Sequence, residues 1–155
     1  IRGEFSLALS IIDRQKSAAI DRRAVRRLVG RILADHGRDD SDVSVLFADD
    51  EAVHRMNREY RNVDRPTDVL AFAMSETAPG EAPVSTGGAE PVLGDVVVST
   101  DRAAVQARRY HRTVEREILK LVAHGVLHLL GYDHEKEKER RAMRRLENRY
   151  LRELG

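Results

Sequence analysis

The chain contains no cysteine, and we expect neither a membrane span nor a secretory signal in it. Without cysteine there are neither disulfides nor thiolate metal ligands, and a reducing compartment is the natural home. No apolar run approaches the roughly 20 residues that a membrane span needs. The N-terminal segment has no charged region followed by an apolar core and a cleavage site. We therefore expect a cytoplasmic protein with no membrane partner.

Aromatic residues and lysine are also scarce. Aromatic residues make up 5% of the chain, and no glycine-rich phosphate-binding loop is present. A platform of aromatic side chains for stacking bases is therefore not predicted. The chain has 4 lysines against 23 arginines. Arginine suits planar, bidentate contact with phosphate, although a GC-rich genome also favours arginine codons.

Length and composition indicate one domain with a full hydrophobic core. The 155 residues are 41% hydrophobic and 34% charged, with a net charge of +1. Such a chain is globular and nearly neutral. Its bulk charge does not by itself require a nucleic-acid partner. We expect residues 1–155 to form a single domain.

The periodicity of apolar residues predicts four strands and five helices. Strands are expected around Phe5–Leu9, Val43–Phe47, Thr67–Phe72 and Leu93–Val98. Helices are expected over Val25–Leu33, from Asp49 or Asp50 to Tyr60, from a Thr100 cap to about Tyr110, from Thr113 onwards, and from about Lys136 to Leu154. The last strand is apolar on both faces and should be central. The order β-α-β-α-β-β-α-α-α predicts an α+β domain, with one mixed four-stranded sheet packed with helices.

Side-chain patterns add detail to these elements. Residues 75–91 hold three prolines and three glycines, which predicts a flexible surface loop rather than a linker between domains. The residues expected to face inward are Val53, Met56 and Tyr60 in the second helix, and Met143, Leu146 and Tyr150 in the last helix.

Three histidines in the C-terminal half form the most specific motif. His124 and His128 are four residues apart, so on a helix their imidazoles lie one turn apart and can meet at one point. Gly131 can end that helix in a left-handed cap, after which the chain can bring His134 to the same point. Three neutral imidazoles with one position left for water form the ligand set of a catalytic zinc site. The sequence predicts this site on the helix and the following turn.

The residue after His124 argues against peptide hydrolysis. Zinc proteases with the pattern His-Glu-x-x-His-x-x-Gly-x-x-His use that glutamate as the general base. Gly125 stands at this position and has no side chain. Loss of a general base costs on the order of 10²–10⁴ in rate. A substrate that needs a metal hydroxide and charge stabilisation fits better than a peptide.

Four segments carry a family resemblance: residues 57–61 (Asn-Arg-Glu-Tyr-Arg), 64–72, 93–99 and the histidine block 124–134. Together they resemble the YbeY family of bacterial metal-dependent endoribonucleases. The resemblance is collinear from about Val43 to Gly155. Ala71 and Ala73 stand where a serine and a proline are usual, which concerns the shape of the loop rather than the metal site.

The resemblance implies cleavage of single-stranded RNA. It further implies maturation of the 3′ end of small-subunit (16S) ribosomal RNA and a role in ribosome quality control. His124, His128 and His134 would bind one zinc ion, and Arg61 would be the catalytic basic residue of the cleft. The partners would be ribosomal RNA and proteins of the small ribosomal subunit. Three histidines also accept other divalent transition metals.

Phosphodiester chemistry would give Arg61 a definite role. A metal ion can supply hydroxide at neutral pH by lowering the pKa of bound water to about 7. Arg61 could hold the phosphate through two parallel hydrogen bonds, a geometry that lysine cannot reproduce. Taken without the surrounding motif, Arg61 would be an ordinary surface arginine.

Three aspartates each keep a structural and a functional interpretation. Asp133 either orients a ligand imidazole or serves the turn after the helix. Asp68 either belongs to the site or opens a strand. Asp95 lies in an otherwise apolar strand and needs a partner, either structural or at the cleft. By contrast, His36, His54 and His111 are isolated and expected to be ordinary surface histidines.

Two other functions remain open. A zinc hydrolase of another class, peptidase-like, shares the spacing of the ligands. A non-enzymatic ribosome assembly factor would use zinc only to hold the fold. The fourth coordination position separates these cases, because a protein ligand such as Asp133 would make the site structural and a water would leave it catalytic.

Overall fold

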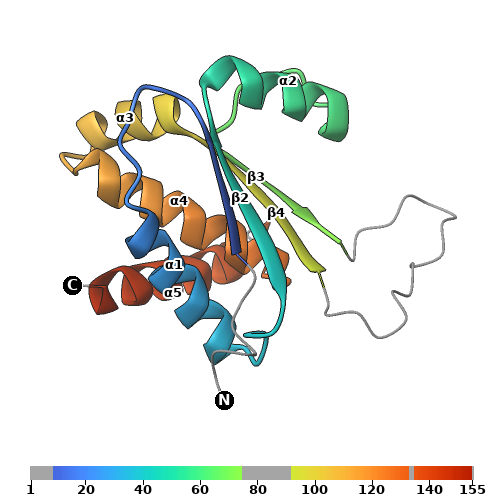
Figure 1. Cartoon of the computed structure of the whole chain (residues 1–155), viewed down its shortest axis with the longest axis vertical. Helices are drawn as coiled ribbons and strands as arrows, with labels where there is room; N and C mark the ends of the chain where they lie inside the picture. Colours follow the sequence, from blue (N-terminus) through green and yellow to red (C-terminus); the bar gives the residue numbers. More distant parts are fainter. Residues whose placement is uncertain (1–8, 75–91, 133–134, 155) are drawn as a thin grey trace, which may run out of the picture.

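The computed structural model describes residues 9–74, 92–132 and 135–154 (Figure 1). Its elements are β1 (Leu9–Arg14), α1 (Arg22–Asp35), β2 (Asp42–Ala48), α2 (Asp50–Arg61), β3 (Val69–Ala73), β4 (Val92–Ser99), α3 (Thr100–Arg109), α4 (Val114–Leu129) and α5 (Glu137–Glu153). The order of elements and the α+β class that the sequence predicts are confirmed.

The four strands form one mixed sheet in the order β1-β2-β4-β3. β1, β2 and β4 run parallel, and β3 pairs antiparallel with β4. β4 is therefore a central strand, as its apolar sequence predicts. Its Val96 and Val98 are buried in the main core, and its Val97 is buried in a smaller cluster on the opposite face.

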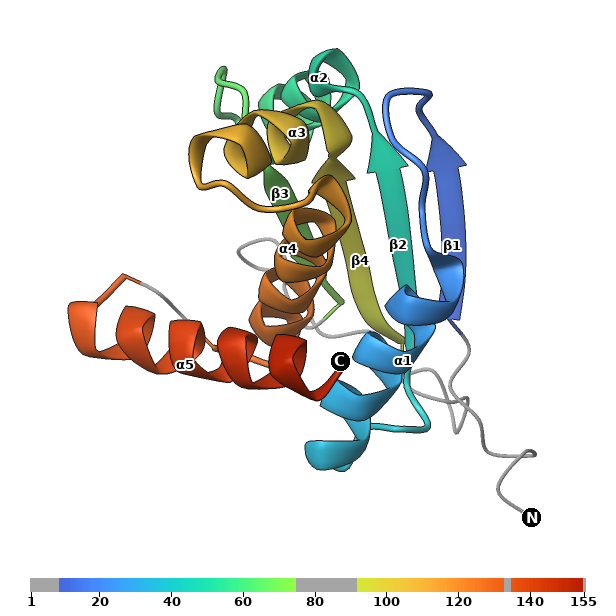
Figure 2. The ribbon, with the colours of Figure 1, turned by 90° about the vertical axis from the view of Figure 1, so that its left-hand side faces the viewer.

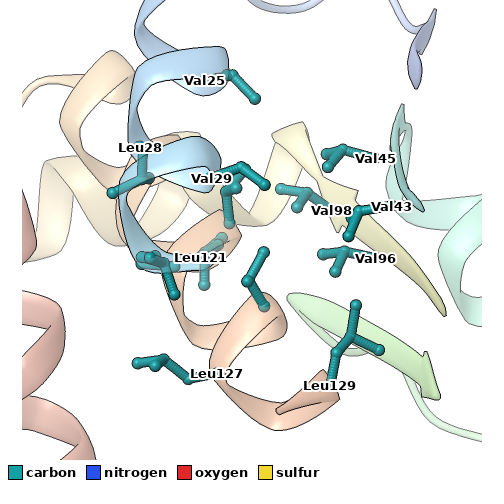
Figure 3. Packing of buried hydrophobic residues seen from close by; sticks show 14 of the residues in the cluster. Val25, Leu28, Val29, Val43, Val45, Val96, Val98, Leu121, Leu127 and Leu129 are labelled. Carbon is teal, nitrogen blue, oxygen red and sulfur yellow. The ribbon is translucent and has the colours of Figure 1, made fainter. Parts of the chain in front are cut away.

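Helices cover the two faces of the sheet unequally. α1 and α4 lie against one face, and α5 crosses α4 on the side away from the sheet (Figure 2). α2 covers part of the other face, where Val53 packs with Leu70 and Val97. The main core lies between the sheet and the α1–α4 layer (Figure 3). Its members include Val25, Leu28 and Val29 of α1, Val43 and Val45 of β2, Val96 and Val98 of β4, and Leu121, Leu127 and Leu129 of α4.

α4 is the helix around which the domain is built. It contacts β3, β4, α1, α3 and α5. It begins at the Thr113 cap, whose hydroxyl accepts a hydrogen bond from the Arg116 amide at 3.1 Å. It ends in the left-handed cap that the sequence predicts, because Gly131 has φ +102°. Two hydrogen bonds close this cap: Gly131 N–H donates to the His128 carbonyl at 3.0 Å, and Tyr132 N–H donates to the Leu127 carbonyl at 3.1 Å.

The described part of the first strand extends beyond Leu9, where its apolar pattern ends. Pairing with β2 runs from Leu9, which lies opposite Val43, to Arg14. Leu9 and Ile11 face the main core. Phe5 and Leu7 lie outside the described residues, and so does the loop predicted over residues 75–91.

Two predictions for helices are wrong. Tyr60 does not face inward but is 71% exposed, with its ring edge-on to the Phe72 ring at 6.0 Å between centroids. The cap of α3 is Ser99, whose hydroxyl accepts from the Arg102 amide at 3.2 Å. Thr100 is instead the first helical residue, and its buried hydroxyl donates to the Gln15 side chain at 3.0 Å. In the described part of the chain, no helix is both long and apolar enough to cross a bilayer.

Candidate active site

The two helical histidines lie side by side on α4. Their ring centroids are 4.8 Å apart, with the ring planes at 74°. Both side chains line a cleft of about 700 Å³. The four-residue spacing therefore brings the imidazoles together as predicted. His134 and Asp133 lie outside the described residues. Among the residues that are described, no three His, Asp or Glu side chains are close enough together to hold a metal ion.

A buried carboxylate holds the first of these imidazoles. Nδ1 of His124 lies 3.0 Å from Oε2 of Glu147, a side chain that is only 7% exposed. An unpartnered carboxylate would be costly at this depth, so the contact is best formed by Nδ1–H donating to the carboxylate. This tautomer leaves the lone pair on Nε2, the nitrogen that can take a metal. The donor set of His124 and His128 thus fits a zinc ion.

Glu147 is a functional candidate that the sequence analysis missed. It lies four residues after Met143 and three before Tyr150, and both of these are buried on the inner face of α5. A glutamate within such an apolar stripe is the available signal, since a buried charge needs a partner. The identity of that partner depends on how α5 crosses α4.

Gly125 allows α4 to lie close to the sheet beneath the histidines. A Cβ atom at this position would lie 2.5 Å from Cγ1 of Val96 and 3.3 Å from Cγ2 of Val69. These distances are shorter than ordinary van der Waals contact, so the space for a larger side chain is already filled. A glutamate base of the protease kind has no room at this position.

Arg61 reaches the same cleft from the last turn of α2. Its guanidinium donates a hydrogen bond to the Ala71 carbonyl of β3. The guanidinium carbon also lies 4.8 Å from the centroid of the Phe72 ring. Arg61, His124 and His128 all line this cleft, so the three predicted residues that the structure describes come together.

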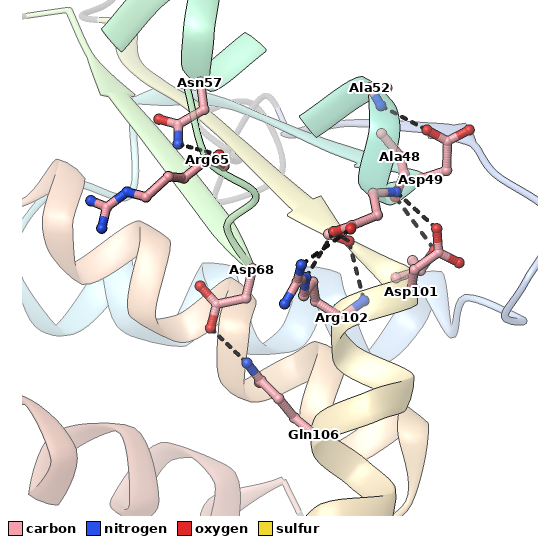
Figure 4. A network of polar contacts seen from close by, with 12 residues as sticks. Ala48, Asp49, Ala52, Asn57, Arg65, Asp68, Asp101, Arg102 and Gln106 are labelled. Atoms are coloured by element: carbon pink, nitrogen blue, oxygen red, sulfur yellow. Dashed lines mark hydrogen bonds and ion pairs between the residues drawn. The ribbon is translucent and has the colours of Figure 1, made fainter. Parts of the chain in front are cut away.

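The connection between α2 and β3 forms part of the cleft wall. The side-chain amide of Asn57, which is buried, donates to the Arg65 carbonyl at 2.8 Å (Figure 4). Arg102 of α3 binds Asp50 at the start of α2, with Nε 3.0 Å from Oδ1. This hydrogen bond raises the pKa of Arg102. α2, and with it Arg61, is therefore fixed at both ends.

The structure separates the roles of two aspartates. Asp68 lines the cleft, and its Oδ2 accepts from Nε2 of Gln106 at 3.0 Å (Figure 4). Asp68 therefore both lines the cleft and forms a structural contact with α3. Asp95 is exposed and accepts a hydrogen bond from the Ser44 hydroxyl. Asp95 does not line the cleft, so its partner is structural.

His36 is not the surface residue that its isolation suggests. It is half-buried, with Nδ1 2.6 Å from the Ile32 carbonyl and Nε2 2.9 Å from the Tyr132 hydroxyl. It therefore links α1 to the turn after α4. His54 pairs with Asp64 at 2.8 Å, and His111 is exposed, as expected.

The fold and the cleft define an α+β protein in which two helical histidines and an arginine line one cleft. A sequence profile described as "Endoribonuclease YbeY" matches residues 10–155. The chain belongs to the YbeY family of endoribonucleases, as its motifs predict.

Similar proteins cover most of the chain. An endoribonuclease YbeY of Pelotomaculum thermopropionicum is 51% identical over 117 residues, which are 76% of this chain and 74% of that protein. One of Bacillus licheniformis is 41% identical over 140 residues, or 89% of each chain. A solution structure of a Thermotoga maritima protein has a TM-score of 0.61 and 26% identity, covering 94% of this chain and 88% of that one.

Proposed function

We propose that the chain is a metal-dependent endoribonuclease for single-stranded RNA, with its reaction centre in the cleft that α2, β3 and α4 line. One observation carries this proposal. The side chains of Arg61, His124 and His128 line a single cleft, although they come from two separate helices. Membership of a family of endoribonucleases supports RNA as the substrate.

The proposed metal is one zinc ion, held by His124, His128 and His134. Zinc would supply an acidified water and neutralise charge on the phosphate. Glu147 accepts the Nδ1 proton of His124 at 3.0 Å and so directs Nε2 outwards. Such hydrogen bonds to ligand histidines fix the ring and raise its basicity. Water in the fourth position would keep the site catalytic rather than structural.

Arg61 would bind the scissile phosphate. A guanidinium can form two parallel hydrogen bonds to phosphate oxygens. The Ala71 carbonyl and the Phe72 ring hold that of Arg61 from the side of β3. The Arg61 side chain is thus positioned before the substrate binds. It therefore needs little reorganisation when negative charge develops on the phosphate in the transition state.

The biological substrate we propose is the 3′ region of small-subunit (16S) ribosomal RNA in the cytoplasm. Ribosome quality control would be the wider role, and small-subunit proteins would be the partners. The family resemblance supports these assignments. A peptidase is disfavoured because Val96 fills the space of a glutamate at position 125. A non-enzymatic assembly factor would share the fold but would not cleave RNA.

The direct test is cleavage of a labelled single-stranded RNA, with a duplex of the same sequence as the comparison. We expect cleavage of the single strand, loss with a chelator and recovery when zinc is added back. Arg61→Ala should reduce the rate by about 10²–10³, the typical effect of removing one charge-stabilising donor. Arg58→Ala is the matched control, because Arg58 is exposed on α2 and does not line the cleft.

The outcomes separate the candidates. Cleavage that persists in the chelator would contradict the proposed site. A zinc-bound chain that cuts no RNA would favour the assembly factor. Hydrolysis of a peptide that disappears in His128→Ala would favour the peptidase. Arg61→Lys should keep the charge and still lose most of the activity, since lysine has no bidentate geometry.

A further inference from the structure

A second cleft adjoins the candidate active site. It has a volume of about 570 Å³ and lies between α4, α5 and the turn from α3 to α4. His124 and Asp68 line both clefts, so the two are continuous past these side chains. Figure 2 shows how the helices that line it are arranged, with α3 above α5 and α4 between them. The reaction described above does not use this second cleft.

The walls of this cleft carry an excess of positive charge. Its basic residues are Arg112, Lys120, Arg140 and Arg144. Its three carboxylates are already engaged by neighbouring groups: Glu117 with Arg112 at 3.3 Å, Glu147 with His124 at 3.0 Å and Asp68 with Gln106 at 3.0 Å. Within the described part of the chain, Lys120 and Arg144 pair with no carboxylate. Because four basic side chains face three carboxylates, a polyanion would meet a small excess of positive charge here, at Lys120 and Arg144.

An exposed aromatic side chain stands at the rim. Tyr110 ends α3, lines the cleft and is 53% exposed. The guanidinium carbons of Arg109 and Arg112 lie 5.9 Å and 5.5 Å from the centroid of its ring. Proteins that bind single strands combine a basic groove with aromatic rings and guanidinium planes on which unpaired bases stack. Tyr110 provides such a ring although the chain as a whole is poor in aromatic residues.

We infer that this cleft binds the stretch of single-stranded RNA next to the cleaved phosphate. One base stacks on Tyr110, and Lys120 and Arg144 neutralise the backbone phosphates. This inference rests on the proposed endoribonuclease function. It also gives a reason for single-strand specificity, because the bases of a duplex are stacked on each other and cannot reach a tyrosine in a cleft.

The test measures binding and cleavage separately. Binding of a labelled single-stranded RNA is followed by fluorescence anisotropy in chelator, and cleavage is followed with zinc. Tyr110→Ala should raise Kd and KM about tenfold and leave kcat nearly unchanged, the effect of losing one stacked base. Tyr110→Phe keeps the ring and should stay within about twofold. Circular dichroism verifies that each variant is folded.

A charge-matched pair of variants tests the basic wall. Arg144 lines the cleft and Arg145, the next residue of α5, is exposed and does not line it. Arg144→Glu should raise Kd at least fivefold, and Arg145→Glu should change it little. The double variant Lys120→Ala, Arg144→Ala should lower the slope of log Kd against log salt by about 1.4, or 0.7 per lost phosphate contact.

Each outcome supports or overturns the inference. RNA binding that is equal in wild type, Tyr110→Ala and Arg144→Glu would overturn it. Equal weakening by Arg144→Glu and Arg145→Glu would also overturn it, because bulk charge would then be the cause. A wild-type chain that binds RNA through Tyr110 but does not cut it would contradict the proposed function and support this cleft as an RNA-binding site.

Discussion

At the scale of single residues, the contact between Glu147 and His124 is the contact of the site that is hardest to predict from the sequence. The histidine spacing predicts that His124 and His128 meet, since helix geometry alone decides it. The carboxylate comes from another helix, and local patterns do not describe how two helices cross. Glu147 is 5% exposed and lies within the buried stripe of α5.

Removing this carboxylate should weaken metal binding. Glu147→Ala leaves His124 without its acceptor, and loss of such a partner typically lowers metal affinity by about 10–100-fold. Glu147→Gln keeps an acceptor oxygen and should lose less. Competition with a zinc chelator measures the affinity, and Glu139→Ala, an exposed position on α5, is the control. Unchanged zinc affinity in Glu147→Ala would show that Glu147 serves the fold alone.

At the scale of elements, the placement of α4 against the sheet decides where the histidines lie. Gly125 faces Val96 of β4, where a Cβ would be 2.5 Å from Cγ1. From the sequence alone, Gly125 shows only that the glutamate base of the zinc proteases is missing at this position. In the structure the same residue is also a close approach of helix and strand, which one-dimensional periodicity cannot reveal.

Gly125→Ala should therefore destabilise the domain. The added methyl overpacks the contact with Val96, which typically costs about 1–3 kcal/mol. Urea unfolding measures the loss. In the double variant Gly125→Ala, Val96→Ala, the free energy of unfolding should fall by less than the sum of the two single changes, because the second substitution creates the missing space. Strict additivity would mean that the two side chains do not compete for this space.

Most elements could be predicted from the sequence, and the failures have physical causes. The spacing of apolar residues predicts buried strands such as β2 and β4 and amphipathic helices such as α1. Ser99 and Thr100 are neighbours that can both cap a helix, so tertiary contacts decided between them. Tyr60 lies on the inner stripe of α2 by spacing, yet it is exposed. A spacing rule states which side chains share a face and not how far the sheet extends beneath them.

At the scale of the whole molecule, α5 is held across the domain by a contact with α1. The Tyr150 hydroxyl donates to Oδ2 of Asp35 at 2.8 Å. Burial, with help from the Asp35 hydrogen bond, raises the pKa of Tyr150 from 10.0 to about 12. The same hydrogen bond, with Arg31 and Arg149, lowers the pKa of Asp35. This contact holds the helix that carries Glu147.

Stability should consequently fall at alkaline pH. Between pH 10 and 12 the unfolded Tyr150 is ionised while the folded one keeps its proton, so rising pH favours unfolding. The loss is on the order of 2 kcal/mol. Tyr150→Phe should be less stable than wild type at neutral pH by about 1 kcal/mol and should lack this part of the alkaline loss. Urea unfolding at several pH values measures both effects.

Tyr110→Phe provides the control for this prediction, because Tyr110 is 53% exposed and forms no contact with Asp35. It should follow the wild-type pH profile. An alkaline loss that Tyr150→Phe retains in full would show that other groups cause it.

The cleft that residues of α2 and α4 share is likewise a property of the whole fold. Arg61 and His128 are far apart in the sequence, and both helices contact β3 and β4, the strands between them. The family resemblance anticipates this shared cleft, whereas composition and spacing do not. The central claim is that RNA cleavage takes place there and depends on a metal.

The most direct test follows zinc content and the rate of RNA cleavage in one preparation. Zinc is added in steps to metal-free protein, and the two quantities are compared. We expect the rate to rise in proportion to bound zinc and to level off at one ion per chain, and His128→Ala should reach neither the content nor the rate. Full cleavage by the metal-free chain would contradict the account.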